Sequence, residues 1–124
     1  EYYERAKNLK YLFPKIISPH SYISDHSNID EGTIVMHDAL INSHCNIEKN
    51  CIINSKALIE HDVTVGAHSH ISTAAVINGA AVIGKGCFIG SNATVGEGVT
   101  IGDESIISAG AYIKNNIPPK TTYK

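Results

Sequence analysis

The sequence predicts an all-β fold: a parallel β-helix made of hexapeptide repeats, preceded by a short N-terminal helical segment. The first observation is a column of Ile and Val that recurs at every sixth position from Ile17 to Ile113 without a break. The second is a column four positions later in each repeat, from Ser21 to Ile117, in which every residue before Ile117 is no larger than Val. A large branched residue and a smaller one, repeated every six residues, are typical of the two inward positions of such a helix.

The repeat length also predicts the shape of each coil. Three hexapeptides close one triangular coil of roughly 18 residues, and the coils stack at the usual strand spacing of ~4.8 Å. The repeats therefore predict between about five and six coils, which form one domain with a continuous core.

The two ends of the chain differ from the repeats. Tyr2, Ala6 and Leu9 have helical spacing, and Pro14 would stop a helix. We expect residues 1–13 to be the remnant helix of a missing N-terminal subdomain and residues 14–119 to be the β-helix. The ladder should end at Pro118 and Pro119, which cannot donate to it, so that residues 120–124 form a tail.

Composition excludes several classes of function. The net charge of −2 argues against binding to nucleic acid or to an anionic membrane. No apolar run approaches the ~18 residues of a transmembrane helix, and no signal peptide is visible. The three cysteines all fall in the column of small inward residues, and we expect them to be reduced core residues of a cytoplasmic protein, not nucleophiles.

Outward-facing columns predict an assembly. Residues 18 apart stack on one wall, and two of the three outward stacks are mainly apolar. These contain Ile34, Ile52, His70, Phe88 and Ile106, and Leu40, Leu58, Val76, Thr94 and Tyr112. Apolar surface of this kind on a soluble prism indicates burial against partners, and a closed homotrimer suits a triangular coil. Scattered surface aliphatics without a partner are the alternative.

The seven histidines all avoid the inward columns, and the densest polar group is Glu60-His61-Asp62, followed by His68 and His70. A neutral imidazole accepts a proton near pH 7, and an adjacent carboxylate fixes its tautomer. Gly79 should stack directly on His61 one coil later, which leaves a slot beside the ring and exposes a backbone N–H to a developing oxyanion. His70 interrupts an apolar stack and needs a polar partner there. A structural histidine bonded to a carbonyl is the alternative for both.

The run from Asn54 to Asp62, with the Val65-Gly66 pair and the Ser69–Ser72 segment after it, resembles the sialic-acid O-acetyltransferase family of hexapeptide-repeat enzymes. That family includes N-acetyltransferases of nucleotide-linked amino sugars, and the similarity covers residues 14–119. It implies a left-handed β-helix, although most parallel crossovers are right-handed. It also implies a homotrimer with acetyl-CoA as co-substrate and a sugar or nucleotide sugar as acceptor.

The resemblance also implies roles for single residues. His61 matches the catalytic base, Asp62 the acid that orients it, and Gly79 the glycine whose N–H meets the thioester carbonyl. His70 matches a histidine near the thioester and Asn54 a polar residue that lines the substrate site. Ser91 and Ala109 match backbone positions that contact the pantetheine arm of coenzyme A.

These implications lead to one main hypothesis and two alternatives. The main hypothesis is an acetyl-CoA-dependent acetyltransferase that acts on a sugar by direct attack, with His61 as general base and no metal. It leaves open whether nitrogen or oxygen is acetylated and which sugar is the acceptor. The alternatives are a zinc site closed by histidines between chains, as in hexapeptide-type carbonic anhydrases, and a non-catalytic scaffold or regulator of sugar biosynthesis.

Overall fold

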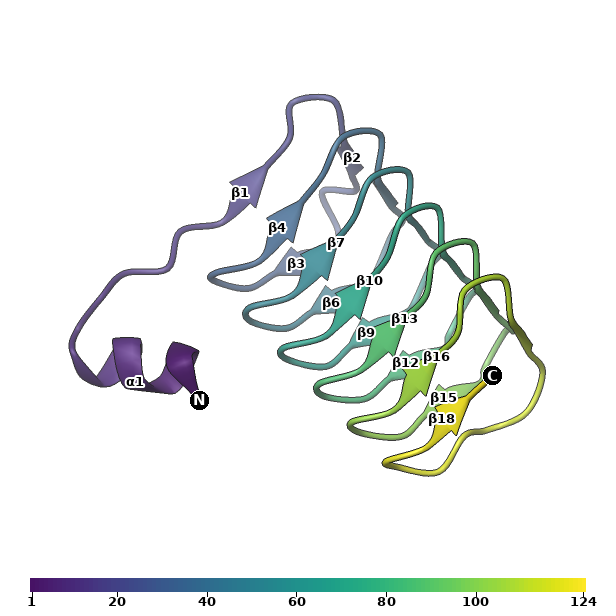
Figure 1. The fold of residues 1–124 in the computed structure, drawn as a ribbon. Coiled ribbons are helices and arrows are strands. Elements are labelled where there is room, and N and C mark those ends of the chain that lie inside the picture. The colour runs from purple at the N-terminus through teal and green to yellow at the C-terminus, as the bar shows by residue number, and fades with distance from the viewer.

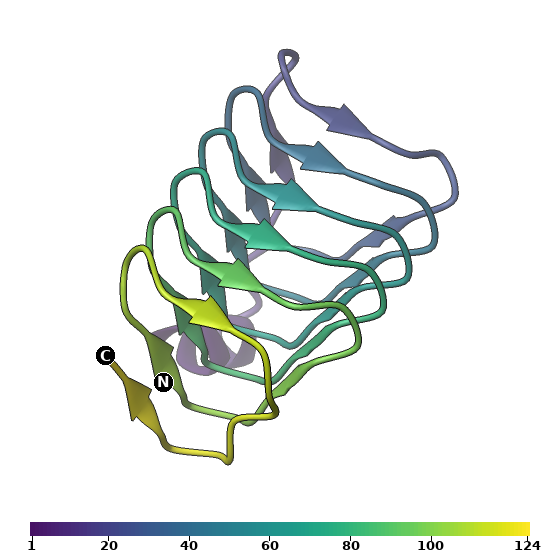
Figure 2. The same ribbon diagram turned by 90° about the vertical axis from the view of Figure 1, so that its right-hand side faces the viewer.

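The computed structural model describes residues 1–124 and confirms the parallel β-helix with a short N-terminal helix. The chain winds through three flat walls in turn, and each wall is a parallel sheet of two-residue strands (Figure 1). In Figures 1 and 2 the chain runs clockwise while it advances toward the viewer, so the coils are left-handed. No helix of the structure is long and apolar enough to cross a membrane.

The three sheets follow one another along the chain. The first contains β1 (Ile16–Ile17), β4 (Ile34–Val35), β7 (Ile52–Ile53), β10 (His70–Ile71), β13 (Phe88–Ile89), β16 (Ile106–Ile107) and β18 (Thr122–Tyr123). The second contains β2 (Tyr22–Ile23), β5 (Leu40–Ile41), β8 (Leu58–Ile59), β11 (Val76–Ile77), β14 (Thr94–Val95) and β17 (Tyr112–Ile113). The third contains β3 (Asn28–Ile29), β6 (Asn46–Ile47), β9 (Thr64–Val65), β12 (Val82–Ile83) and β15 (Thr100–Ile101).

Turns between the sheets form three corners. The first corner joins the first and second sheets (residues 54–57, for example), the second joins the second and third (60–63), and the third joins the third and first (66–69). One residue of most turns has a positive φ, as at Lys56, Asp62 and His68. Asp and Asn are enriched among the non-glycine residues that adopt this conformation.

The register is the one that the repeat predicted. Residues 18 apart pair across neighbouring coils, as Ile53 pairs with Ile71 and Ile71 with Ile89. The second residue of each strand points inward, and in the middle coils these Ile and Val side chains are fully buried. Near the N-terminal end the core is open, and Ile17 is 43% exposed.

The small inward column carries a ladder of hydrogen bonds at the third corner. The Ser69 hydroxyl donates to the Gly84 carbonyl at 2.8 Å and accepts from the Cys87 N–H at 3.0 Å. Cys51 and Cys87 take the same place in the neighbouring coils, and their thiols donate to the carbonyls of Gly66 and Gly102 at 3.3 and 3.2 Å. All three cysteines are free and buried, and burial raises the pKa of Cys51 to about 11.

The last coil is shorter than the others, and the ladder continues past the prolines at which the sequence predicted its end. Ile106 pairs with Thr122, and Ile101 with Ile117, so both partners are 16 residues apart, not 18. Ile117 therefore sits opposite a large inward residue, not in the small column to which the repeat had assigned it. The loss of two residues shortens the turn after β17.

The helix α1 (Tyr2–Asn8) packs against the third corner of the early coils (Figure 1). Its buried residue is Tyr3, whereas Tyr2 and Leu9, which the helical spacing picked out, are exposed. The Tyr3 hydroxyl donates to Glu31 Oε1 at 2.8 Å, and Lys7 pairs with the same oxygen. Burial and the hydrogen bond to Glu31 raise the pKa of Tyr3 to about 12. The buried Tyr3 side chain thus attaches the helix to the coil that contains Glu31.

Candidate active site

His61 and Asp62 lie together on a turn of the second corner, one coil after Ser43. The Asp62 N–H donates to the Ser43 carbonyl at 3.0 Å, which fixes the turn on the coil below. Asp62 has φ of 60°, and its carboxylate lies 2.8 Å from Nδ1 of His61. A carboxylate only accepts hydrogen bonds, so Nδ1 carries the proton and Nε2 of the neutral ring is left with its lone pair. This is the tautomer that a general base with a free Nε2 requires.

Negative charge surrounds this imidazole. The hydrogen bond that His61 donates to Asp62 and the negative charge of Asp62 raise the pKa of His61, and the charges of Glu60 and Glu97 act in the same direction. Sequence reasoning did not single out Glu97. It occupies the same turn position as His61 and Gly79, two coils after His61, so the 18-residue spacing was the signal that could have found it.

Gly79 lies directly on the His61 ring, as the stacking predicted. The next N–H, that of Ala80, donates to the His61 carbonyl at 2.9 Å, so the two turns are neighbours on adjoining coils. A Cβ at residue 79 would lie 2.7 Å from Cε1 and 2.8 Å from Nε2 of the ring. The predicted slot is therefore filled by the imidazole itself. The Gly79 N–H makes no hydrogen bond within the chain, so it is free to meet an acceptor.

Asn54 and His70 form a second polar pair, at the first corner and on the first sheet. The Asn54 amide nitrogen lies 3.1 Å from Nε2 of His70, which gives the interrupted apolar stack its polar partner. His70 pairs in the ladder with Ile52 and Phe88, and its ring meets the Phe88 ring edge-on at 5.2 Å. Burial lowers the pKa of His70, so it is neutral near pH 7.

Ser91 and Ala109 occupy the same position in successive turns of the first corner. The Gly110 N–H donates to the Ser91 carbonyl, but the N–H groups of Ser91 and Ala109 themselves make no hydrogen bond within the chain. Gly90 lets the two turns approach closely, since a Cβ there would lie 2.5 Å from the Ala109 nitrogen. Two unpaired N–H groups one coil apart are suited to an extended ligand with spaced carbonyl oxygens.

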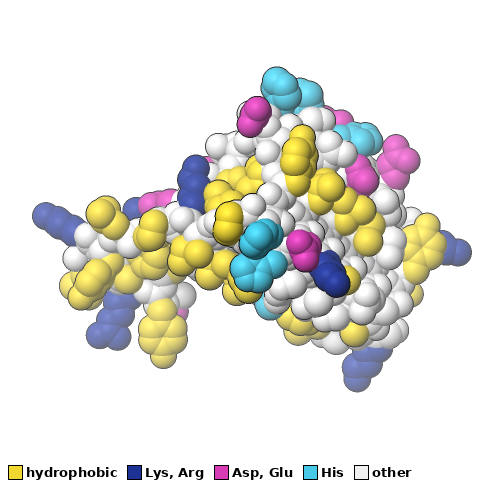
Figure 3. Space-filling model, turned by 90° about the horizontal axis from the view of Figure 1, so that it is seen from above, with side chains coloured by type: hydrophobic (Ala, Val, Ile, Leu, Met, Phe, Trp, Pro, Cys, Tyr) yellow, Lys and Arg dark blue, Asp and Glu magenta, His cyan; other side chains and the backbone are white.

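Within one chain the candidate residues fall into two groups at different corners. His61, Asp62 and Gly79 share the second corner, whereas Asn54, His70, Ser91 and Ala109 lie at the first corner or on the first sheet. His68 belongs to neither group, because it lies at the third corner between Asn50 and the Tyr3 ring of α1. Figure 3 shows histidines gathered in two places on the surface with hydrophobic side chains between them.

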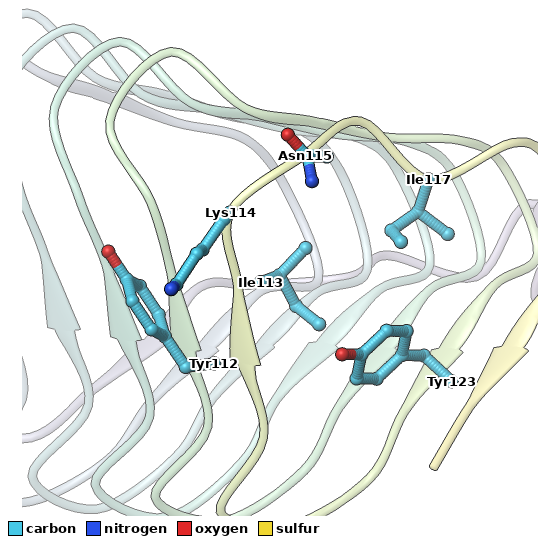
Figure 4. Close-up of a pocket in the computed structure, with 6 residues that line it drawn as sticks. All are labelled: Tyr112, Ile113, Lys114, Asn115, Ile117 and Tyr123. Atoms are coloured by element: carbon cyan, nitrogen blue, oxygen red, sulfur yellow. The ribbon is translucent and has the colours of Figure 1, made fainter.

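Neither cavity of the chain contains a candidate site residue. One of about 290 Å³ lies at the C-terminal end and is lined by Tyr112, Ile113, Lys114, Asn115, Ile117 and Tyr123 (Figure 4). The other, of about 400 Å³, is lined by Lys15, Asn28, Ile29, Asp30, Glu31 and Lys49. Within the chain, no three His, Cys, Asp or Glu side chains are close enough to hold a metal ion. His61 thus stands on a convex corner that does not enclose a substrate by itself.

Comparison with known proteins supports the resemblance seen in the sequence. Residues 80–115 match the model of the hexapeptide repeat of succinyl-transferase. Comparison with curated proteins gives no match.

Solved structures give much closer matches. The acetyltransferase domain of PglB from Neisseria gonorrhoeae superposes with a TM-score of 0.96 at 30% identity, over 98% of this chain and 59% of that one. Its complex with acetyl coenzyme A matches with a TM-score of 0.94 at 31% identity, over 97% of this chain and 58% of that one. PerB from Caulobacter crescentus, in complex with CoA and GDP-perosamine, gives a TM-score of 0.96 at 30% identity, over 98% of this chain and 58% of that one. The chain thus spans less than two thirds of the length of these structures.

Proposed function

Because this chain is a hexapeptide-repeat β-helix similar to the acetyltransferase domain of PglB and to PerB, we propose that it is an acetyl-CoA-dependent N-acetyltransferase of a nucleotide-linked amino sugar. The observation that carries the proposal is the position of His61, with Asp62 on Nδ1 and Gly79 against Nε2. One of the similar structures is a complex with acetyl coenzyme A and another is a complex with CoA and GDP-perosamine, which supports this choice of substrates.

His61 acts as the general base in the proposed reaction. The sugar amine attacks the thioester carbonyl carbon, and Nε2 accepts the proton that the nitrogen loses as the new C–N bond forms. When the C–S bond breaks, the same proton passes to the sulfur of the leaving coenzyme A. Asp62 stabilises the intermediate imidazolium, because its carboxylate accepts from Nδ1 in both states of the ring.

The tetrahedral intermediate needs donors for its oxyanion. The unpaired N–H of Gly79 lies beside the catalytic ring, and the imidazole of His70 is a second candidate donor. Backbone donors that are already fixed in place need no reorganisation during the reaction. The unpaired N–H groups of Ser91 and Ala109 would hold carbonyl oxygens of the pantetheine arm along the stacked coils.

The proposed active site is shared between chains of a homotrimer. His61 lies on a convex corner, and the other candidate residues lie on a different one, so no single chain encloses the reactants. The outward side chains Phe88, Ile106 and Tyr112 are 39%, 46% and 55% exposed in the isolated chain. A closed ring of three chains would cover such apolar surface and set the second corner of one copy beside the first sheet of the next.

The cellular setting follows from the co-substrate and the cysteines. Acetyl-CoA is made inside cells, and three free, buried thiols are typical of proteins in a reducing compartment. Both support action in the cytoplasm.

A thiol-release assay tests the proposal. Acetyl-CoA is incubated with the protein and with nucleotide-linked sugars that carry either a free amine or only hydroxyl groups, and release of coenzyme A is followed. We expect turnover with an amine acceptor and a loss of about 10²–10⁴-fold in kcat for His61→Ala. Wild-type turnover by His61→Ala would refute the role of His61, and preference for hydroxyl acceptors would refute N-acetylation.

A further inference from the structure

We propose that Asn54 is a positioning residue that holds His70 as the Nδ1–H tautomer, so that the first sheet presents an imidazole N–H donor to the acyl group. This inference gives His70 a defined chemical state and gives Asn54 a task other than contact with the substrate. It deepens the function proposed above and rests on it for the identity of the acceptor, but the tautomer can be measured without any assay of activity.

The orientation of the Asn54 amide is fixed by its own turn. The Ser55 N–H donates to Oδ1 of Asn54 at 2.8 Å, so the oxygen is committed to the backbone. The amide nitrogen then faces Nε2 of His70 at 3.1 Å. Rotation of the amide by half a turn would set its NH₂ group against the Ser55 N–H, two donors without an acceptor between them. The nitrogen therefore donates to His70.

A donor on Asn54 determines which ring nitrogen of His70 is protonated. Nε2 has to accept this hydrogen bond, so the proton of the neutral ring resides on Nδ1. The side chains that flank His70 in the ladder, Ile52 and Phe88, carry no charge that would favour the imidazolium. Burial among them lowers the pKa of His70 and keeps the ring neutral.

The protonated nitrogen is available to a ligand. Nδ1 of His70 makes no hydrogen bond within the chain, and no side-chain nitrogen or oxygen of the protein is buried without a partner. Since Nδ1 has no partner, it is not buried, and it must be accessible at the surface of the first sheet. This is the surface at which the apolar stack would meet a second copy of the chain. A neutral N–H donor in a poorly solvated place is suited to a carbonyl oxygen that gains charge during acyl transfer.

The same device recurs at the second corner. The Ser43 N–H donates to Oδ1 of Asn42 at 2.8 Å, and the Asn42 amide nitrogen donates to Glu60 at 3.0 Å. Both turns carry the sequence Ile-Asn-Ser. In each, the backbone holds the amide oxygen and directs the NH₂ group at an ionisable side chain of another turn or strand. Asn42 provides a matched control, because it makes the same backbone contact at the second corner and its amide nitrogen contacts Glu60, not His70.

Nitrogen-15 NMR of the full chain with labelled histidine tests the inference directly. The two neutral tautomers have distinct ¹⁵N shifts and couplings, and the His70 signals are assigned by their loss in His70→Gln. We expect the wild-type ring to carry its proton on Nδ1. In Asn54→Asp one carboxylate oxygen can keep the bond from the Ser55 N–H, while the other can only accept a hydrogen bond from His70. The proton of the His70 ring should therefore move to Nε2. The control Asn42→Asp should leave the His70 signals unchanged.

Kinetics at alkaline pH, where His70 is neutral in both proteins, add a second readout. Loss of one oxyanion donor predicts a fall of about 10²-fold in kcat for Asn54→Asp, with little change in the KM for acetyl-CoA. A wild-type ring protonated on Nε2, or an unchanged tautomer in Asn54→Asp, would overturn the inference. If the Nδ1–H tautomer is found in a protein without acetyltransferase activity, the inference about Asn54 stands and only the proposed function fails.

Discussion

The His61 ring occupies the space that the first side-chain atom of residue 79 would fill, because a Cβ there would lie 2.8 Å from Nε2. The side chain of one residue thus fills the side-chain space of the residue 18 positions later, on the adjoining coil. The absence of a side chain at Gly79 leaves room for Nε2 of His61, and the backbone N–H of Gly79 makes no hydrogen bond within the chain.

Gly79→Ala should therefore inactivate the protein without unfolding it. Gly79 does not have a positive φ, so alanine fits its backbone, and the half-exposed His61 ring can swing outward to relieve the overlap. Displacement of the base predicts a loss of about 10²–10⁴-fold in kcat. Lys85→Ala, at the equivalent position of the next turn along the chain, is the control. Wild-type kcat in Gly79→Ala would contradict this account of the site.

The pH dependence of kcat/KM should report the His61–Asp62 pair. The base works only when unprotonated, so activity rises with pH through the pKa of His61, which Asp62 holds above the ordinary value of 6.5. Asp62→Asn removes the negative charge, so the rising limb should move to lower pH. Its plateau should fall by at least ~10-fold, because the tautomer is no longer held. A limb that stays in place or moves to higher pH would show that Asp62 does not act on this ring.

Mixing two inactive variants should restore activity if the site is shared between chains. His61→Ala and His70→Ala damage different corners, and a mixed trimer contains interfaces at which both histidines are intact. Random assembly of equal amounts gives intact pairs at about a quarter of the interfaces, so about a quarter of the wild-type activity should return after joint refolding. Light scattering establishes the trimer in each sample. No recovery from a mixture that does form trimers would place the site within a single chain.

The three cysteines should be unreactive in the native protein. Burial raises the pKa of all three thiols, and that of Cys51 reaches about 11, so a thiol-specific disulfide reagent should react only after unfolding in urea. Radiolabelled acetyl-CoA without acceptor should leave no label on the protein, since no exposed cysteine is available to carry the acetyl group. Rapid labelling of one native thiol, or a stable acetyl-enzyme, would require a different mechanism.

Stability should depend on the coil in which an inward side chain lies. Ile59 is fully buried in the middle of the prism, and Ile59→Ala should lower the free energy of unfolding by about 2–5 kcal/mol. Ile23 is only partly buried near the open N-terminal end, so Ile23→Ala should cost less than half as much. Urea unfolding at one fixed protein concentration compares the two. Equal losses would mean that the end of the prism is covered in solution.

Periodicity made most of the fold predictable. The position of a residue in its repeat fixes its wall, its direction and its neighbours, which is why the contact of His61 with Gly79 could be derived from spacing alone. The register failed only at the last coil, where two residues are lost before Ile117. The size of Ile117 in a column of small residues was the available sign of that change.

Hydrogen-bond direction and helix docking could not be derived in the same way. The Asn54–His70 contact depends on how an amide is held by the Ser55 N–H, which no repeat encodes. The spacing in residues 1–10 indicated a helix, but the face that it buries depends on what it packs against, and that partner is Glu31 of a coil reached later in the chain. Long-range side-chain partners of this kind are set by tertiary packing.

The strict pairing of residues 18 apart also determines how the chain tolerates changes in length. Removal of 18 residues, one whole coil, would move every later residue to the preceding coil but leave it in the same sheet. Removal of one hexapeptide between His61 and Gly79 would instead move every later residue to the adjacent sheet or corner. The His61 ring would then lie against Lys85 in place of Gly79. Insertions and deletions in this protein should therefore preserve the fold and the site only when their length is a multiple of 18 residues.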